Sequence, residues 1–150
     1  MMLETGDLGL LRSFEDASLP EEDFDHEKHV HAAWCFLQQY GLQDGREKFI
    51  AALRRFVVIH GAADKYHETI TRAFLDLIAS RVSTRADWQS FRSGNRIIIE
   101  DGMSLLLRHY SSQVLFSDRA RKAFVEPDII PFPGPEADSA ASDGREIAGD

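Results

Sequence analysis

The sequence predicts an all-α protein, an up-down bundle of four main helices with short accessory helices and an extended, proline-rich C-terminal strap. Two observations carry this prediction. Apolar residues recur at spacings of three and four, as in Phe49, Leu53 and Phe56, which is the period of an amphipathic helix. Glycines end two of the helical segments, at Gly41 and Gly61, and the short connections favour antiparallel neighbours.

The N-terminal part of the chain is expected to hold two helices. A short amphipathic helix ends before Pro20, because the residue that precedes a proline disfavours helical geometry. The next helix is predicted over residues 26–40, with Asp23 or Asp25 as its N-cap and Gly41 as its C-terminal stop.

Two further core helices are predicted in the middle of the chain. Asp44 opens the first, which covers residues 46–60. The second begins near Asp64 and continues to about Val82. Its apolar stripe consists of Ile70, Phe74, Leu77 and Ile78.

The sequence of residues 85–101 does not decide between a helix and a strand. The run of three isoleucines suits a short strand, whereas Trp88 and Phe91 fit a helix, which we favour. A final core helix is predicted over residues 102–111, and a short helical turn over 117–124.

The C-terminal part separates into a strap and a tail. Residues 125–135 contain four of the five prolines and are expected to lie extended over the bundle, with Ile129, Ile130 and Phe132 docked on it. Residues 134–150 have too few apolar side chains to offset the entropy of ordering. We therefore expect one helical domain, residues 1–133, and a disordered acidic tail.

Charge and composition exclude several classes of partner and favour one compartment. Lys and Arg total 17 against 25 Asp and Glu, which gives a net charge of −8 that repels nucleic acid and anionic membranes. No run approaches the roughly 18 apolar residues of a membrane span. Cys35 is the only cysteine, and the N-terminus lacks the pattern of a signal peptide. We expect a cytoplasmic protein with a small-molecule substrate, and the oligomeric state stays open.

Three of the six histidines lie within six positions of one predicted helix. At about 100° per residue, His26 shares its face with Val30 and Leu37 and is expected to point inward. His29 lies about 60° to one side. His31 falls on the opposite face and is expected to be solvated, and Cys35 lies on that side as well.

Other polar residues are predicted to meet these histidines. His67 shares a face with apolar residues of its helix, and His60 and His109 each follow an apolar residue by four positions. In an antiparallel bundle the first and third helices begin where the second and fourth end. The residues expected at this one end are His26, His29, His60, His67, Glu68 and His109.

This composition favours a metal-dependent enzyme, because imidazole and carboxylate groups are the usual ligands of zinc and non-haem iron. The expected ligands of one divalent ion, zinc or iron, are His26, His29 and Glu68, with His67 and His109 as substitutes. The bound ion would activate water for hydrolysis or support oxygen chemistry.

Two alternatives stay open. In a metal-free enzyme, His26 or His67 would be the general base, with Glu68 as its orienting carboxylate. In a non-enzymatic binding or regulatory module, the histidines would be structural and the strap and tail would engage a partner. Thiol catalysis is excluded because Cys35 lies away from the proposed cluster, and the aromatic residues Trp34, Phe36 and Tyr40 are expected in the core.

Three motifs resemble those of a family of small bacterial proteins. The family pattern is Trp-Thr-His-x-x-His, then Tyr-(His/Asn)-Glu-Thr-x-Thr, then Tyr-Ser and a late Pro-Asp. The matching positions are His26, His29, Tyr66, His67, Glu68, Thr69, Thr71, Tyr110, Ser111, Pro127 and Asp128, while Phe24 and Asp25 replace the Trp-Thr pair. The resemblance covers about residues 10–133 and implies no activity. Because the family accepts asparagine in place of His67, it favours His26, His29 and Glu68 as ligands.

Overall fold

The computed structural model describes residues 3–132, which form eight α-helices, two 3₁₀ helices and no strand. The elements are α1 (Thr5–Glu15), η1 (Glu21–Asp23), α2 (His26–Tyr40), α3 (Leu42–Ile59), η2 (Ala63–Lys65), α4 (Glu68–Ala79), α5 (Trp88–Gly94), α6 (Arg96–Leu106), α7 (Ser112–Leu115) and α8 (Asp118–Lys122). The all-α bundle is therefore confirmed. None of these helices has the length and apolar character needed to cross a membrane.

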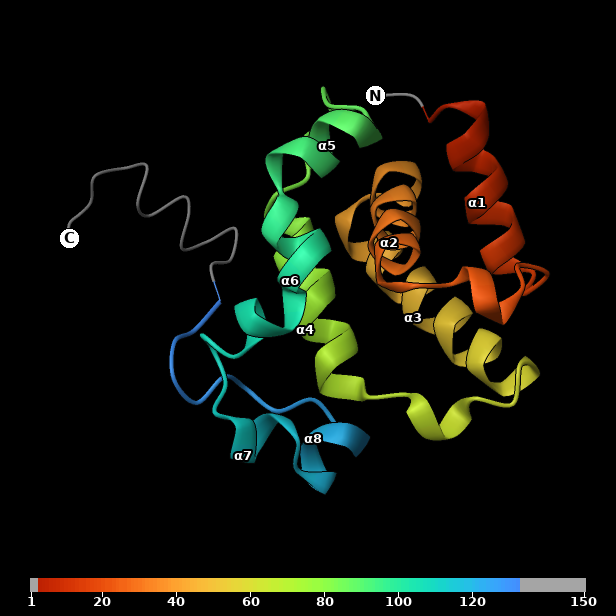
Figure 1. The fold of residues 1–150 in the computed structure, drawn as a ribbon. Coiled ribbons are helices and arrows are strands. Elements are labelled where there is room, and N and C mark those ends of the chain that lie inside the picture. The colour runs from red at the N-terminus through yellow and green to blue at the C-terminus, as the bar shows by residue number, and fades with distance from the viewer. Residues whose placement is uncertain (1–2, 133–150) are drawn as a thin grey trace, which may run out of the picture.

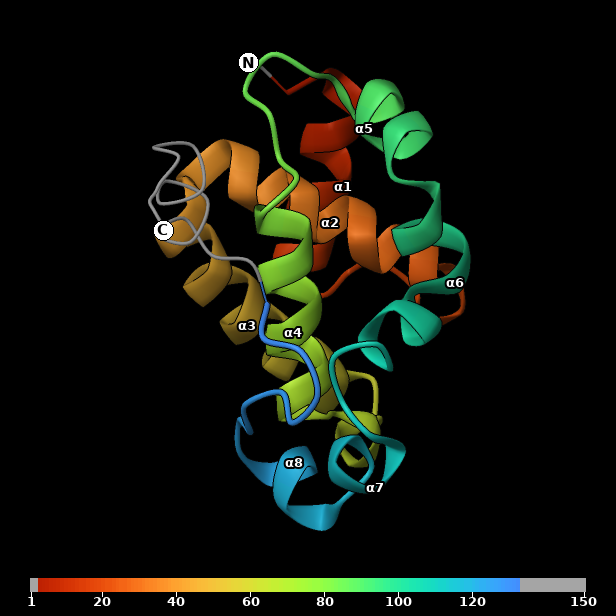
Figure 2. The same cartoon turned by 90° about the vertical axis from the view of Figure 1, so that its left-hand side faces the viewer.

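The central element is α2, which packs between α1, α3, α4 and α6 (Figure 1). In the view of Figure 2, α4 crosses in front of α2. The six consecutive residues Ala32–Leu37 have at most 2% of their surface exposed, including Trp34, Cys35 and Phe36. A helix whose full circumference is apolar has to be enclosed by other elements. The prediction that Trp34 and Phe36 belong to the core is confirmed.

Local sequence signals explain how α2 begins and how it joins α3. The Asp25 carboxylate accepts the Lys28 backbone N–H at 2.9 Å and is the N-cap that the sequence predicts. Gly41 has φ of 90°, a conformation open mainly to glycine, which turns the chain sharply between the two helices. Because helical geometry resumes directly after this residue, α3 begins at Leu42 and not at residue 46.

Other boundaries also differ from the predicted ones. Instead of one helix from Asp64, the chain forms the 3₁₀ turn η2 and then α4, whose N-cap is His67. The run of isoleucines lies in α6, so the helical interpretation of this region is correct. α6 also includes part of the predicted final helix, and it is kinked at Asp101, where φ is −150°.

The described part of the C-terminal strap, residues 125–132, contains no helix or strand and bends at residues 128–130, and it docks through fewer residues than predicted. Ile129 and Ile130 are 54% and 51% exposed, so the prediction that they dock is wrong. Their backbone N–H groups donate to the His109 carbonyl, which directs both side chains outward. Phe132 packs on the His109 and Tyr110 rings, as predicted. The expected disorder of residues 134–150 lies outside the described residues.

The close packing of α2 on α3 predicts that any side chain at Gly45 destabilises the fold. A Cβ atom at this position would lie 2.6 Å from the Phe36 carbonyl oxygen and 2.9 Å from the Leu37 Cα, both backbone atoms that cannot move aside. Gly45→Ala should therefore lower the free energy of unfolding by about 1–3 kcal/mol, measured by urea denaturation.

Gly9→Ala is the matched control, because a Cβ at this helical position meets nothing within 4 Å. That variant should be neutral or more stable by about 0.5–1 kcal/mol. Equal stabilities of the two variants would contradict the packing described here.

Candidate functional site

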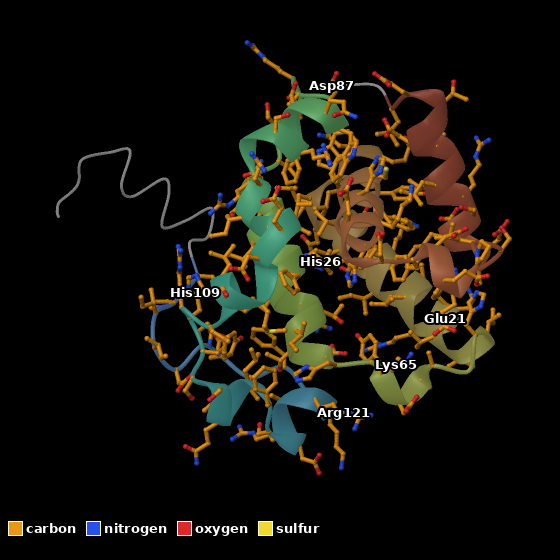
Figure 3. The ribbon with its side chains drawn as sticks, viewed as in Figure 1. Glu21, His26, Lys65, Asp87, His109 and Arg121 are labelled. Carbon is orange, nitrogen blue, oxygen red and sulfur yellow. The ribbon has the colours of Figure 1, made fainter. Side chains whose placement is uncertain are left out.

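A pocket of about 610 Å³ lies where α2, α3 and α4 meet the two 3₁₀ turns. Its wall is mainly apolar and includes Phe24, Leu53, Phe56, Val57, Ala62 and Ile70. Glu21 and Lys65 also line it, and Figure 3 shows them close together on η1 and η2. Their charged groups form an ion pair of 3.7 Å between Lys65 Nζ and Glu21 Oε2. A concave, apolar pocket with a few polar groups is the usual form of a small-molecule site.

His29 contributes its imidazole to this pocket. The ring stacks on Phe24, with centroids 5.4 Å apart, and packs against Phe49 at the same distance. Burial, together with the nearby positive charge of His26 when protonated, lowers the pKa of His29 to about 4. The side chain is therefore neutral at pH 7.

His29 differs from the other five histidines in its hydrogen bonds. Four histidine side chains pair with backbone carbonyls of distant segments: His26 with Ile98 at 2.8 Å, His60 with Ala17 at 3.1 Å, His67 with Leu115 at 2.9 Å and His109 with Ile130 at 2.8 Å. His31 pairs with Asp7 at 2.8 Å. Within the part of the chain that the structure describes, the His29 ring has no hydrogen-bond partner. His29 is therefore the one histidine of the six whose ring nitrogens are not engaged by another group among the described residues.

Glu68 is held by three donors at the start of α4. Arg54 of α3 donates to Oε1 at 2.7 Å, Tyr66 donates to the same oxygen at 2.7 Å, and Arg72 donates to Oε2. Burial raises the pKa of Glu68, but the hydrogen bonds from Arg72, Arg54 and Tyr66 outweigh burial and lower it to about 2. The carboxylate is thus ionised and fully paired.

His67 is the N-cap of α4, and both of its ring nitrogens are used. Nδ1 accepts the Ile70 backbone N–H at 3.1 Å, so the proton lies on Nε2 and is donated to the Leu115 carbonyl. Burial lowers the pKa of His67, which favours this neutral form. His67 lines the pocket, but neither nitrogen is left for a metal ion or for proton transfer.

The five predicted metal ligands are not assembled as a group. His26 and His29 are neighbours, with ring centroids 6.5 Å apart. His109 lines a different hollow and lies far from Glu21 and Lys65 in Figure 3, because it follows the kinked α6 and bonds to the strap. Glu68 faces two guanidinium groups. A metal ion bound by these residues stays a prediction. The carbonyl and guanidinium groups that already pair with them do not favour it.

A different group brings three candidate ligands together on the opposite side of α2. The group consists of Asp7 of α1 and His31 and Cys35 of α2. One potential ligand atom from each residue lies within 4.8 Å of the other two, and no other group of three among the described residues meets this condition. These residues could hold a metal ion. The prediction that His31 is solvated is wrong: its side chain is 15% exposed and stacks on Trp88 with centroids 4.0 Å apart.

The residues of the second and third motifs have structural partners. The Thr69 hydroxyl donates to the Ala123 carbonyl and accepts the Val125 N–H, at 2.9 and 3.1 Å. The Tyr110 hydroxyl donates to the Val125 carbonyl at 2.6 Å. The Asp128 carboxylate accepts the Ser111 N–H at 2.8 Å. These motif residues fix the C-terminal segment on α4 and α7.

No protein-family model, curated protein or solved structure matches the chain. The resemblance of its motifs to a bacterial family stays a prediction. The geometry of the pocket and of the ligand group therefore carries the inference of function.

The pairing of Glu68 predicts a specific acid sensitivity. Its pKa is about 2 in the folded protein, below the value of 4.5 for an unperturbed side chain. The unfolded state therefore binds more protons between these values, and stability is lost as the pH falls from about 5 to 2. The lowered pKa of Glu68 corresponds to a contribution of up to roughly 3 kcal/mol to the free energy of unfolding at pH 7. In the Glu68→Gln variant the free energy of unfolding, measured by urea denaturation at several pH values, should not show this loss.

Glu100→Gln is the control for the same chemical change. Glu100 pairs with Arg96 in an exposed i,i+4 ion pair, and such pairs contribute little. This variant should follow the wild-type pH dependence. If Glu68→Gln also keeps the wild-type slope, the Glu68 network does not stabilise the fold as described.

Proposed function

We propose that the protein binds a small, mostly apolar, uncharged molecule in the pocket between α2, α3 and α4, with the neutral His29 ring contacting its polar group. The observation that carries this proposal is the imidazole that lines the pocket of about 610 Å³ without a hydrogen-bond partner among the described residues. The other five histidines have one.

The apolar lining supplies most of the binding free energy in this proposal. Phe24, Phe56 and Ile70 line a concave volume large enough for a small organic molecule. Burial of apolar ligand surface contributes about 25 cal/mol per Å² before the cost of lost freedom is subtracted. Shape and apolar area would set affinity, and one polar contact would set orientation.

The charges favour an uncharged ligand. Lys65 is paired with Glu21, and Glu22 adds a further negative charge to the lining. A neutral imidazole offers one N–H donor and one acceptor nitrogen, which suits a hydroxyl, carbonyl or amide group. An anion would have no unpaired cation to meet among the described lining residues.

Catalysis by His29 is a second candidate, favoured by the lowered pKa of this group. An imidazole that is unprotonated at pH 7 can accept a proton from a bound substrate. A base with a pKa of about 4 provides little driving force for that transfer, because the best general bases have a pKa near the working pH. Binding is therefore the function that the site supports better.

A zinc- or iron-dependent reaction at His26, His29 and Glu68 is less favoured. Arg54 and Arg72 already neutralise the Glu68 carboxylate, and a divalent cation there would be repelled by two positive charges at close range. The Nε2 atom of His26 is occupied by the Ile98 carbonyl. A regulatory module with structural histidines agrees with the four carbonyl-bonded rings, and it is compatible with ligand binding at His29.

Filling the pocket tests the proposal. Val57 lines the pocket and Val58, the next residue, is 67% exposed. A library of uncharged fragments with hydroxyl or amide groups is screened against the wild type by ligand-observed NMR. Val57→Trp should weaken binding of the hits by at least about tenfold, or 1.4 kcal/mol, because the indole occupies the same volume.

Val58→Trp is the matched control and should keep wild-type affinity. Circular dichroism establishes that both variants are folded. Fragments that bind equally well to the Val57→Trp protein, or a library without a single hit on the wild type, would refute the pocket as a binding site.

A further inference from the structure

The second feature of interest is the group formed by Asp7, His31 and Cys35 on the side of α2 away from the pocket. His31 and Cys35 are four residues apart, so they project from the same face of α2 on consecutive turns. Asp7 reaches them from the first turn of α1. The imidazole Nε2 lies 2.8 Å from the carboxylate Oδ1, and all three ligand atoms lie within 4.8 Å of one another.

The Asp7 carboxylate is buried without a permanent positive charge beside it. Asp7 is 6% exposed, and its oxygens accept hydrogen bonds from the Glu4 backbone N–H at 3.0 Å and from His31. No Lys or Arg among the described residues forms an ion pair with Asp7. A buried carboxylate without a permanent cation beside it is costly.

We propose that Asp7, His31 and Cys35 form a zinc site that ties α1 to α2. One carboxylate, one imidazole and one thiolate are all established zinc ligands, and the thiolate selects zinc over magnesium and calcium. Zinc brought to this site has its two positive charges balanced by Asp7 and Cys35.

The group needs only small adjustments to accept the ion. With zinc–ligand bonds of about 2.0–2.3 Å, tetrahedral geometry separates ligand atoms by roughly 3.2–3.8 Å. The atoms now lie between 2.8 and 4.8 Å apart, so shifts of about 1 Å suffice. The Cys35 thiol, which now donates to the Asp7 carbonyl, releases its proton on coordination. For His31 to bind through Nε2, the proton that Nε2 now donates to Asp7 moves to Nδ1, and water completes the coordination.

The surroundings provide a local probe of metal binding. The chain has two tryptophans, and both lie beside His31: the Trp88 ring stacks on it at 4.0 Å and the Trp34 ring lies at 6.2 Å. A paramagnetic ion at the site would therefore quench most of the tryptophan fluorescence. α5, which carries Trp88, shields the group from solvent.

The test uses the full chain, purified without a histidine tag and treated with chelator. Zinc added during dialysis should be retained at one equivalent per chain by elemental analysis, with release of one proton. Co²⁺ should produce a thiolate-to-cobalt charge-transfer band and quench the tryptophan fluorescence. Zinc should also raise the melting temperature, because the ion binds only the folded state.

Three variants decide the outcome. Cys35→Ala and His31→Gln should each weaken zinc binding by more than about 100-fold, beyond the 10- to 100-fold loss that follows removal of a ligand's hydrogen-bond partner. His60→Gln is the control: it removes a histidine that bonds to the Ala17 carbonyl outside the proposed site, and this variant should bind zinc like the wild type. If Cys35→Ala proves unfolded, the cobalt spectrum of the wild type decides alone. Absence of the thiolate band, or zinc binding that survives His31→Gln, overturns the proposal.

Discussion

Both candidate sites depend on the enclosure of α2 by other helices. Because Ala32–Leu37 are buried around the whole circumference of the helix, polar side chains beside this segment meet protein, whereas Lys28 and Gln39 near the ends of the helix are exposed. Buried polar groups nearly always find hydrogen-bond partners. His26 pairs with the Ile98 carbonyl and His31 with Asp7. His29 instead borders the pocket, where its neutral ring can meet a ligand.

The remaining histidines act mainly as connectors. His60, His67 and His109 bond to carbonyls that lie 43, 48 and 21 residues away in the chain. Each such bond satisfies a carbonyl in a loop or at the end of a helix, where no helical N–H is available to it. This explains why the chain places histidines near helix ends. It also explains why their number alone does not indicate a metal site.

Much of the fold follows from the sequence, but less of the site does. Periodicity places α2, α3 and α4, and i,i+4 spacing relates Arg72 to Glu68. A helical face gives the direction of a side chain, not what covers it. The sequence therefore predicts that His31 is solvated, although Asp7 and Trp88 lie against it. The contact of Arg54 with Glu68 arises from tertiary packing, which no local spacing reveals.

The central claim is that His29 is a neutral, unpartnered imidazole open to a ligand pocket. Two-dimensional NMR of the protein labelled with ¹⁵N in its histidine rings tests it most directly. With a pKa of about 4, the His29 nitrogens should show no protonation between pH 8 and 5.5, and a bound fragment should shift them more than those of any other histidine. A midpoint between pH 6 and 7, or fragment-induced shifts at His109 and none at His29, would contradict the account.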